Sequence, residues 1–306
     1  MRRLTPPPST QSPGPHAATV GWRRRPVLQA LALGLAAPVE LAVAAQPRIV
    51  SIGGAITETL YALGADTSLV GVDTTSLYPT AARLLPSVGY ARALSAEGVL
   101  SLSPHMVIAG DEAGPPAVLR QLQSAGVPVN VLAAEDSATG VMQRTDSIAA
   151  LIGKQEAARA LNDQFRREFE QATQRVARHA GAAPRVLFVL AHSMSQLRVA
   201  GQKTAADAML RLAGATNALQ GFDGYKPLNP EAAIAAAPQV LLVTDQGLAA
   251  AGGVEGLLRA PGLAATPAGR ARRVVSLDAL WLLGFGPRLP SAVVALADAL
   301  RAKATA

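Results

Sequence analysis

From Arg48 onward, short apolar segments rich in β-branched residues alternate with stretches rich in Ala and Leu. Glycine, proline or polar residues separate the segments, as at Gly53-Gly54 before AITETLYALGA. Strands that alternate with helices predict an α/β fold with mostly parallel sheets flanked by helices. The expected strands are residues 48–52, 69–73, 106–110, 127–133, 185–192, 239–245 and 273–279, and a helix is expected over residues 204–215.

Residues 137–180 interrupt this alternation. The segment contains no proline, and its apolar residues recur at helical spacing, at Val141, Ile148, Leu151, Ile152, Leu161, Phe165 and Phe169. Such a helix would span about 50–60 Å at about 1.5 Å per residue, unless Gly153 interrupts it. We therefore expect residues 137–180 to form one long rigid helix that links two α/β lobes, residues 45–136 and 181–306.

The two expected lobes share a short sequence pattern. Glu97 lies seven residues before Pro104, and an apolar strand follows; Glu231 lies seven residues before Pro238, and an apolar strand follows there too. Each glutamate lies in the first turn of a short predicted helix. The pattern predicts that the two halves are similar units with these carboxylates at equivalent positions.

Residues 1–44 read as an export signal rather than as part of the fold. A cluster of arginines, residues 23–25, precedes a short apolar segment that ends in Ala42-Val43-Ala44, as in a secretory signal peptide. Pro38 and Glu40 interrupt that segment, which argues against a membrane-spanning helix. Two of the arginines also fit a twin-arginine signal, so both export routes stay open. Either route predicts an exported protein that is soluble after signal cleavage.

Charge and cysteine content exclude several classes of protein. The chain carries 28 basic and 21 acidic residues. Residues 1–44 hold five of the arginines and one glutamate, which leaves 23 basic and 20 acidic residues. This small net charge, with 4% aromatic residues, gives no indication of nucleic-acid binding. The sequence has no cysteine, which excludes disulfides, thiolate metal sites and haem attached through cysteine.

Common catalytic motifs are missing from the sequence. Residues 200–207, AGQKTAAD, lack the spacing of a phosphate-binding loop, and neither G-x-S-x-G nor H-E-x-x-H occurs. The sequence therefore favours a binding protein over an enzyme. The rival class is an exported metal-dependent hydrolase, but its candidate residues at strand ends, His192 and Asp245, have no motif partners.

His192 has the clearest functional position among the histidines. It ends the apolar segment 185–192, and the carboxyl ends of strands face the ligand crevice in open α/β sheets. On this evidence a ligand contact and a capping or core role are both open. His105 and His179 are expected to be surface or structural residues.

Tyr90 and Arg92 lie two residues apart in the segment SVGYARALSAEG. A phenol normally titrates near pH 10, so it binds a metal only when a strong Lewis acid such as ferric iron displaces the proton. A neighbouring cation stabilises the phenolate that forms, and an arginine also binds carboxylates. Spacing alone leaves open a simpler role, in which the tyrosine ring packs against the sheet and the arginine is solvated.

Six ordered segments resemble the periplasmic haem-binding proteins of bacterial ABC-type haem importers. They are RIVSIGGAITETLYALG, GVDTTSLYP, LPSVGYARALSAEGVLSLSP, GPPAVLRQLQSAGVPV, AGQKTAADAMLRLAG and GFDGYKPLNPEAAIAAAPQVLLV. The resemblance covers nearly the whole chain after residue 44. It implies two α/β lobes joined by one rigid helix, with the ligand in the cleft between them.

The same resemblance implies roles for individual residues. It implies that Tyr90 ligates the iron of ferric haem b, that Arg92 lies near the tyrosine or a haem propionate, and that His192 occupies the place of a possible second ligand. Tyr225 and Lys226 are lesser candidates for the rim of the pocket, together with Tyr78. Other cargo remains possible on the same fold: a ferric siderophore or a cobalamin.

Glu97 and Glu231 gain a role from the resemblance as well. In related importers one exposed carboxylate on each lobe contacts arginines of the permease dimer, which works with its ATPase. Carboxylates in the first turn of a helix also stabilise the helix, so this role alone would explain either residue. The implied partners are haem, the permease of a haem importer and an outer-membrane haem receptor system.

Overall fold

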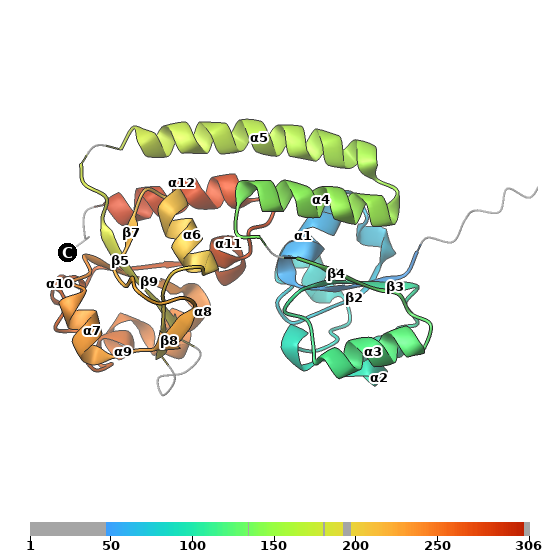
Figure 1. The fold of residues 1–306 in the computed structure, drawn as a ribbon, viewed down its shortest axis with the longest axis horizontal. Coiled ribbons are helices and arrows are strands. Elements are labelled where there is room, and N and C mark those ends of the chain that lie inside the picture. The colour runs from blue at the N-terminus through green and yellow to red at the C-terminus, as the bar shows by residue number, and fades with distance from the viewer. Residues whose placement is uncertain (1–46, 134, 180, 192–196, 303–306) are drawn as a thin grey trace, which may run out of the picture. The chain divides into compact units, whose positions relative to one another are not determined.

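A computed structural model describes residues 47–133, 135–179, 181–191 and 197–302. These residues belong to one compact unit, residues 45–306. In the described part of the N-terminal lobe, four parallel strands form a sheet in the order β2-β1-β3-β4 (Figure 1). Its strands are β1 Ile49–Ile52, β2 Leu69–Val72, β3 Met106–Gly110 and β4 Val129–Leu132. Its helices are α1 Gly54–Ala62, α2 Ala96–Leu100 and α3 Pro116–Ser124, with short 3₁₀ turns at Asp66–Ser68, Thr80–Leu84 and Ala91–Ala93.

The C-terminal lobe contains a mixed sheet in the order β10-β9-β5-β6-β8, with β7 paired to β5. β9, β10 and β7 join it in parallel, whereas β6 is antiparallel to both β5 and β8. The strands are β5 Arg185–Ala191, β6 Leu197–Ala200, β7 Thr216–Asn217, β8 Tyr225–Pro227, β9 Val240–Thr244 and β10 Val274–Leu277. The helices are α6 Ala205–Leu212, α7 Pro230–Ala235, α8 Asp245–Ala250, α9 Gly253–Leu258, α10 Pro267–Arg270, α11 Ala279–Leu283 and α12 Leu289–Arg301.

The predicted α/β class with two helix-flanked sheets is confirmed, and each of the seven predicted strands is present. β1 and β9 are buried along their whole length, because helices cover both faces of each sheet. The antiparallel strands β6 and β8 were not expected from the sequence. They are short and lie toward one edge of the C-terminal sheet.

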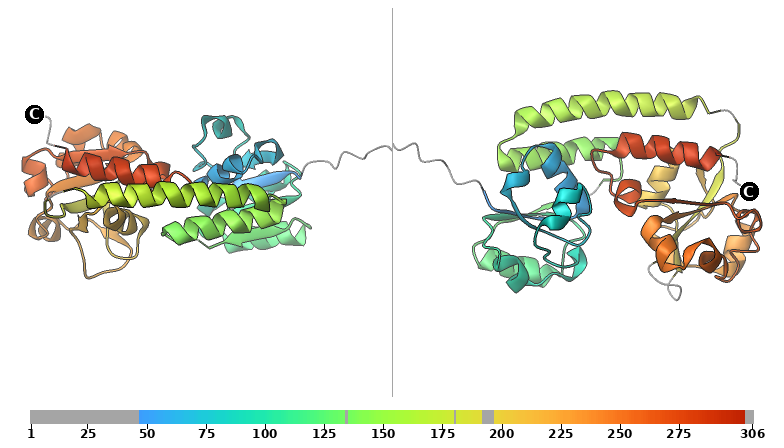
Figure 2. Two further views of the ribbon diagram at one scale, coloured as in Figure 1. Left: turned by 90° about the horizontal axis from the view of Figure 1, so that it is seen from above. Right: turned by 180° about the vertical axis from the view of Figure 1, so that it is seen from behind.

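The segment 137–180 is not one helix. It forms α4, Ala138–Ile152, and α5, Gln155–Ala177, which lie side by side and run in opposite directions (Figures 1 and 2). Gly153 ends α4 in the left-handed conformation, at φ 70°, and the chain reverses there. The expected span of 50–60 Å is therefore wrong, and α5, with 23 residues, is about 35 Å long.

Both linking helices pack in the cores of both lobes. Val141 of α4 and Phe165 of α5 lie in the core beneath the C-terminal sheet. Ile148 of α4 and Ala158 of α5 lie in the core beneath the N-terminal sheet. α5 also packs along α12 of the C-terminal lobe (Figure 1). The lobe boundaries near residues 136 and 180 stay predictions, because the linking helices contribute to both cores.

None of the helices within the described ranges is long and apolar enough to cross a membrane.

We expect Gly153→Ala to reduce the free energy of unfolding by about 1 kcal/mol, because a Cβ atom disfavours the left-handed conformation. The space around Gly153 is open, so strain and not collision causes the loss. Urea denaturation measures the change. Gly98→Ala in α2 is the control, because that glycine is helical and an added Cβ would make only ordinary contacts. An equal effect of the two substitutions would contradict this explanation.

Candidate functional site

The carboxyl ends of the N-terminal strands face the C-terminal lobe across a cavity of about 540 Å³. This is the position at which open α/β sheets bind ligands, and the volume is in the range of small-molecule sites. The N-terminal lobe and α4 supply Gly53, Gly54, Ala55, Ile56, Thr74, Thr75, Leu77, Arg92, Gly110, Asp111, Glu112, Leu132, Asp136 and Arg144. The C-terminal lobe supplies Gln246, Ala279, Leu280, Leu283 and Gly284.

Asp73 shapes the N-terminal wall of this cleft. Its buried carboxylate accepts hydrogen bonds from the backbone N–H groups of Gly53, at 2.9 Å, and Thr75, at 3.0 Å. It also accepts from the hydroxyls of Thr75, at 2.6 Å, and Ser76, at 2.7 Å. Four donors on one carboxylate hold the turns after β1 and β2 together, so the wall is fixed by buried charge-assisted hydrogen bonds.

The two walls approach each other closely at Gly54. An added Cβ there would lie 2.6 Å from the Leu280 side chain of the opposite lobe and 2.5 Å from the Thr75 carbonyl oxygen. Any larger residue would push the walls apart. The preceding Gly53 adopts φ 112°, a conformation that other residues rarely take.

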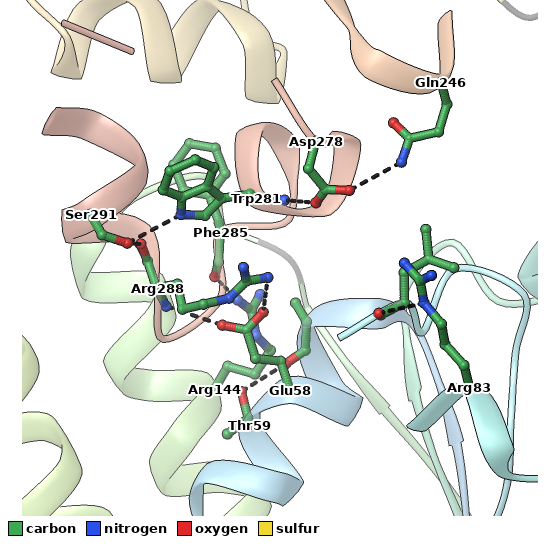
Figure 3. A network of polar contacts seen from close by, with 12 residues as sticks. Glu58, Thr59, Arg83, Arg144, Gln246, Asp278, Trp281, Phe285, Arg288 and Ser291 are labelled. Carbon is green, nitrogen blue, oxygen red and sulfur yellow. Dashed lines mark hydrogen bonds and ion pairs between the residues drawn. The ribbon is translucent and has the colours of Figure 1, made fainter. Parts of the chain in front are cut away.

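α11 carries most of the C-terminal wall, and its first turn is held by side chains. The Asp278 carboxylate caps α11 by accepting from the Trp281 N–H, at 2.9 Å (Figure 3). Gln246 donates to the other oxygen of Asp278, at 3.0 Å, and accepts from the Ala279 N–H, at 3.1 Å. These contacts fix Leu280 and Leu283 as an apolar surface opposite the polar N-terminal wall.

Charged side chains of both signs line the cleft. Glu112 is exposed to solvent in the open cleft, but partial desolvation there is the main cause that raises its pKa; the charge of Asp111 also raises this pKa, while Arg92 opposes the change. Partial desolvation also raises the pKa of Asp136, which is exposed as well, and the charge of Arg144 opposes this change. Burial lowers the pKa of Arg144, whose charge the surrounding carboxylates favour. The cleft is therefore a polar environment that already contains both acceptors and cations.

Arg92 lines this cavity, and Tyr90 lies two residues before it on the same segment, which is anchored by buried side chains. Val88, Ala91 and Leu94 are buried in the N-terminal core, so the residues between them face outward. The Tyr90 residue is 48% exposed, which disfavours the simpler role as a ring packed against the sheet. Arg92 lines the cavity, whereas Tyr90 is not among the residues that line it. The structure thus brings Arg92 into the cleft and leaves the Tyr90 ring accessible beside it.

Tyr225 and Lys226, the other predicted rim residues, also lie outside the cavity lining. The Tyr225 ring packs edge-on against Phe188 in the C-terminal core, with centroids 6.4 Å apart. Burial raises the pKa of its phenol, which is hydrogen-bonded to the backbone of Ala206 and to Thr204. Lys226 is exposed, and its ammonium lies 4.7 Å from the centroid of the Phe222 ring. In this structure Tyr225 has a packing role.

The two histidines within the described residues, His105 and His179, lie where surface or structural residues are expected. His105 accepts from the Arg48 N–H at 3.2 Å, and His179 lies 3.3 Å from Asp298, both away from the cleft. His192 lies outside the described residues. Within the described ranges no group of three or more His, Asp or Glu side chains is placed to hold a metal ion.

Glu97 and Glu231 occupy matching positions in the two lobes. Each is exposed in the first turn of a short helix, α2 or α7. Ser95 caps α2 and Asn229 caps α7 by accepting from a backbone N–H three residues on. Figure 1 shows α2 and α7 on the sides of their lobes away from α5. The shared sequence pattern therefore corresponds to a shared local structure.

Sequence reasoning missed the charges that link the lobes, which are the buried Glu58 and Arg144 and the half-buried Arg288. The Glu58 carboxylate binds Arg288, and the Arg144 guanidinium donates to the Phe285 carbonyl oxygen (Figure 3). A signal was present for Glu58, because it interrupts the apolar helix GAITETLYA without a nearby basic partner in the sequence. Its partner lies 230 residues away, which no local pattern reveals.

Two α/β lobes with a cleft lined from both sides define a two-lobed ligand-binding protein. The family model described as periplasmic binding protein matches residues 49–280. The chain belongs to this periplasmic binding protein family, which confirms the predicted class, a solute-binding protein and not an enzyme.

The fold is similar to that of the periplasmic heme-binding protein BhuT in complex with two hemes. The two are 53% identical with a TM-score of 0.79, over 83% of this chain and 99% of that one. The uncharacterized ABC transporter substrate-binding lipoprotein YvrC of Bacillus subtilis is 26% identical over 83% of this chain and 79% of its own length. A cobalamin-binding protein of Halobacterium salinarum is 29% identical over 64% of this chain, a match that spans 53% of that relative.

We expect Glu112→Gln to become increasingly stabilising relative to the wild type as the pH rises from about 4.3, the ordinary pKa of glutamate, through the raised pKa of Glu112 in the folded protein. Because the folded-state pKa of Glu112 is raised, the wild type loses stability as the pH rises through that value, and glutamine does not ionise. Thermal unfolding at several pH values measures the difference. Glu170→Gln on the exposed face of α5 is the control. A difference that stays constant or shrinks with rising pH would contradict the assignment.

Proposed function

We propose that this protein captures haem b in the cleft between its lobes and delivers it to an inner-membrane ABC importer. The observation that carries the proposal is the pair Tyr90 and Arg92, an accessible phenol beside a cation that lines the cleft. The similarity to a heme-binding protein at 53% identity supports haem as the cargo.

The chemistry of this pair suits ferric haem. A phenolate is a strong anionic ligand for ferric iron, but it forms only if the phenol loses its proton. The guanidinium of Arg92 favours that loss and can also bind a propionate. Apolar side chains of the opposite wall, such as Leu280 and Leu283, are suited to the face of a porphyrin. Here Tyr90 is the proposed iron ligand, and His192 remains a candidate second ligand.

Delivery to a permease is proposed from the two exposed carboxylates. Glu97 and Glu231 lie at matching places on the two lobes, so a two-fold symmetric partner can contact both. The relative from Bacillus subtilis is described as an ABC transporter substrate-binding protein, which supports a permease and its ATPase as partners. Export to the periplasm is part of the same proposal and rests on the signal-like sequence of residues 1–44.

A cobalamin is the second candidate cargo, because a cobalamin-binding relative matches about two thirds of this chain. Cobalamin carries its own axial groups and needs no phenolate. The two cargoes therefore differ in their dependence on Tyr90.

We expect added hemin to give a high-spin ferric charge-transfer band that disappears in Tyr90→Phe, with affinity reduced about tenfold or more. The reason is loss of the anionic oxygen ligand. Visible titration measures both effects, and its end point gives the number of haems per chain. Tyr61→Phe is the control, since Tyr61 lies in α1 against the N-terminal core, away from the cleft.

A wild-type protein without a hemin spectrum would reject haem as cargo. Calorimetric binding of cyanocobalamin in that case, unchanged by Tyr90→Phe, would favour the alternative. The same titration with His192→Ala tests the second ligand, because an unaltered spectrum would exclude direct ligation by that residue.

We expect Glu97→Gln and Glu231→Gln each to slow haem delivery to the cognate permease in proteoliposomes several-fold, and the double variant to slow it further. Each substitution removes a charge that would pair with a basic group of the permease. Hemin affinity in solution should not change. Glu170→Gln is the control for charge alone. Wild-type delivery by the double variant would contradict the docking role.

A further inference from the structure

One turn of the C-terminal lobe, residues 284–288 between α11 and α12, receives side chains from the N-terminal lobe and from α4 (Figure 3). We call Glu58, Arg144, Phe285 and Arg288 the interlobe clasp. The turn directly follows Leu280 and Leu283, which line the cleft. The clasp therefore lies where one cleft wall joins the rest of its lobe.

Glu58 makes the central contact of the clasp. The Glu58 residue is 4% exposed, and its carboxylate accepts two hydrogen bonds from Arg288, one from the backbone N–H at 3.1 Å and one from the guanidinium at 2.9 Å. The Arg288 guanidinium also stacks on the ring of Tyr78 in the N-terminal lobe, 3.6 Å from the ring centroid. Glu58 and Tyr78 thus hold Arg288 from the same lobe.

Arg144 makes an independent contact with the same turn. Its guanidinium donates to the carbonyl oxygen of Phe285, a residue buried in the C-terminal core. Arg144 is 93% buried, since its exposed fraction is 7%, and it lines the cleft. Its Nε has no hydrogen-bond partner within the described residues. The carboxylates of Glu112, Asp136, Glu58 and Asp111 favour its charged form.

Glycine makes the close approach of the turn possible. A Cβ atom on Gly286 would lie 3.1 Å from the Glu58 carboxyl group, so a larger residue would press on the ion pair. Leu280, which lines the cleft, likewise requires a glycine at position 54 of the N-terminal lobe, because a Cβ atom there would lie 2.6 Å from the Leu280 side chain. Gly54 and Gly286 thus allow the two cleft walls to lie close together, and the hydrogen bonds of Glu58 and Arg144 maintain that separation.

We propose that Glu58, Arg144 and Arg288 are positioning residues that fix the separation of the two cleft walls before a ligand arrives. The hydrophobic packing of α4 and α5 resists large displacement of the lobes, but it is not directional. Hydrogen bonds to a defined carboxylate and a defined carbonyl oxygen are directional, and they fix the angle at which α11 meets the N-terminal lobe. Because the walls of such a cleft are already ordered, the protein loses less conformational entropy when a ligand binds.

The test measures the distance between the lobes directly. Because the sequence has no cysteine, Gln121→Cys on α3 and Ala235→Cys on α7 provide two unique exposed sites for spin labels. Pulsed electron paramagnetic resonance then gives the distribution of distances between them. We expect a narrow distribution in the unliganded wild type, and a distribution at least twofold broader in Glu58→Gln and Arg288→Gln.

The matched control is Asp298→Asn. It also converts a carboxylate to an amide and breaks an ion pair, with Arg175 at 2.6 Å, but this pair joins α5 to α12 outside the clasp. Gly286→Ala is a milder variant in case the charge variants unfold, because it keeps both charged groups and moves only the contact between them. Distributions as narrow as the wild type in Gly286→Ala and in the folded charge variants would overturn the proposal.

A second measurement connects the clasp to ligand retention. We expect hemin to leave Glu58→Gln about tenfold faster than the wild type when an excess of apomyoglobin captures it, with the Tyr90 charge-transfer band preserved. This measurement rests on the proposed function, whereas the distances are measured without ligand. Failure of hemin binding would therefore reject the cargo and leave the clasp testable, while an unchanged distance distribution would reject the clasp alone.

Discussion

The structure depends first on two helices that belong to two cores at once. α4 and α5 each place one set of apolar side chains under the N-terminal sheet and another under the C-terminal sheet. Rotation of one lobe away from the other would withdraw Val141 and Phe165, or Ile148 and Ala158, from a packed interior. Such burial stabilises by about 25 cal/mol per Å² of apolar surface. The hydrophobic effect that folds the lobes therefore also opposes their separation.

Hydrogen bonds fix the geometry of the two cleft walls, in addition to the hydrophobic packing by which α4 and α5 hold the lobes together. Asp73 organises the N-terminal wall from within its own lobe, and Asp278 with Gln246 organises the first turn of α11 in the other. The interlobe clasp connects these two supports through directional contacts. A wall substitution that leaves the packing between the walls unchanged is expected to act within its own wall, whereas a substitution in the clasp changes how the two walls face each other.

The sequence predicted the elements of the fold better than their long-range contacts. β1, β3 and β9 are almost entirely apolar, with Ser51 and Thr244 as the exceptions, because both faces of each sheet are covered, and such apolar segments can be recognised in the sequence. The sequence indicates Gly153 only as a possible interruption of the helix. A glycine can adopt either the helical or the left-handed conformation, and the sequence does not show which one it takes. The residue pair Tyr90 and Arg92 was found through a local motif, whereas Glu58 and Arg288, 230 residues apart, left no local pattern.

If the separation of the cleft walls is fixed, the shape of a ligand decides whether it can enter the cleft. A flat iron porphyrin needs two surfaces a constant distance apart, whereas a corrinoid with bulky groups on both faces needs a wider space. If the walls moved freely, one cleft would suit either ligand, and side chains such as Tyr90 would carry all of the selectivity. If Glu58, Arg144 and Arg288 hold the walls as proposed, the wall separation would exclude a ligand of the wrong shape, and under the proposed function Tyr90 would select only among ligands that fit.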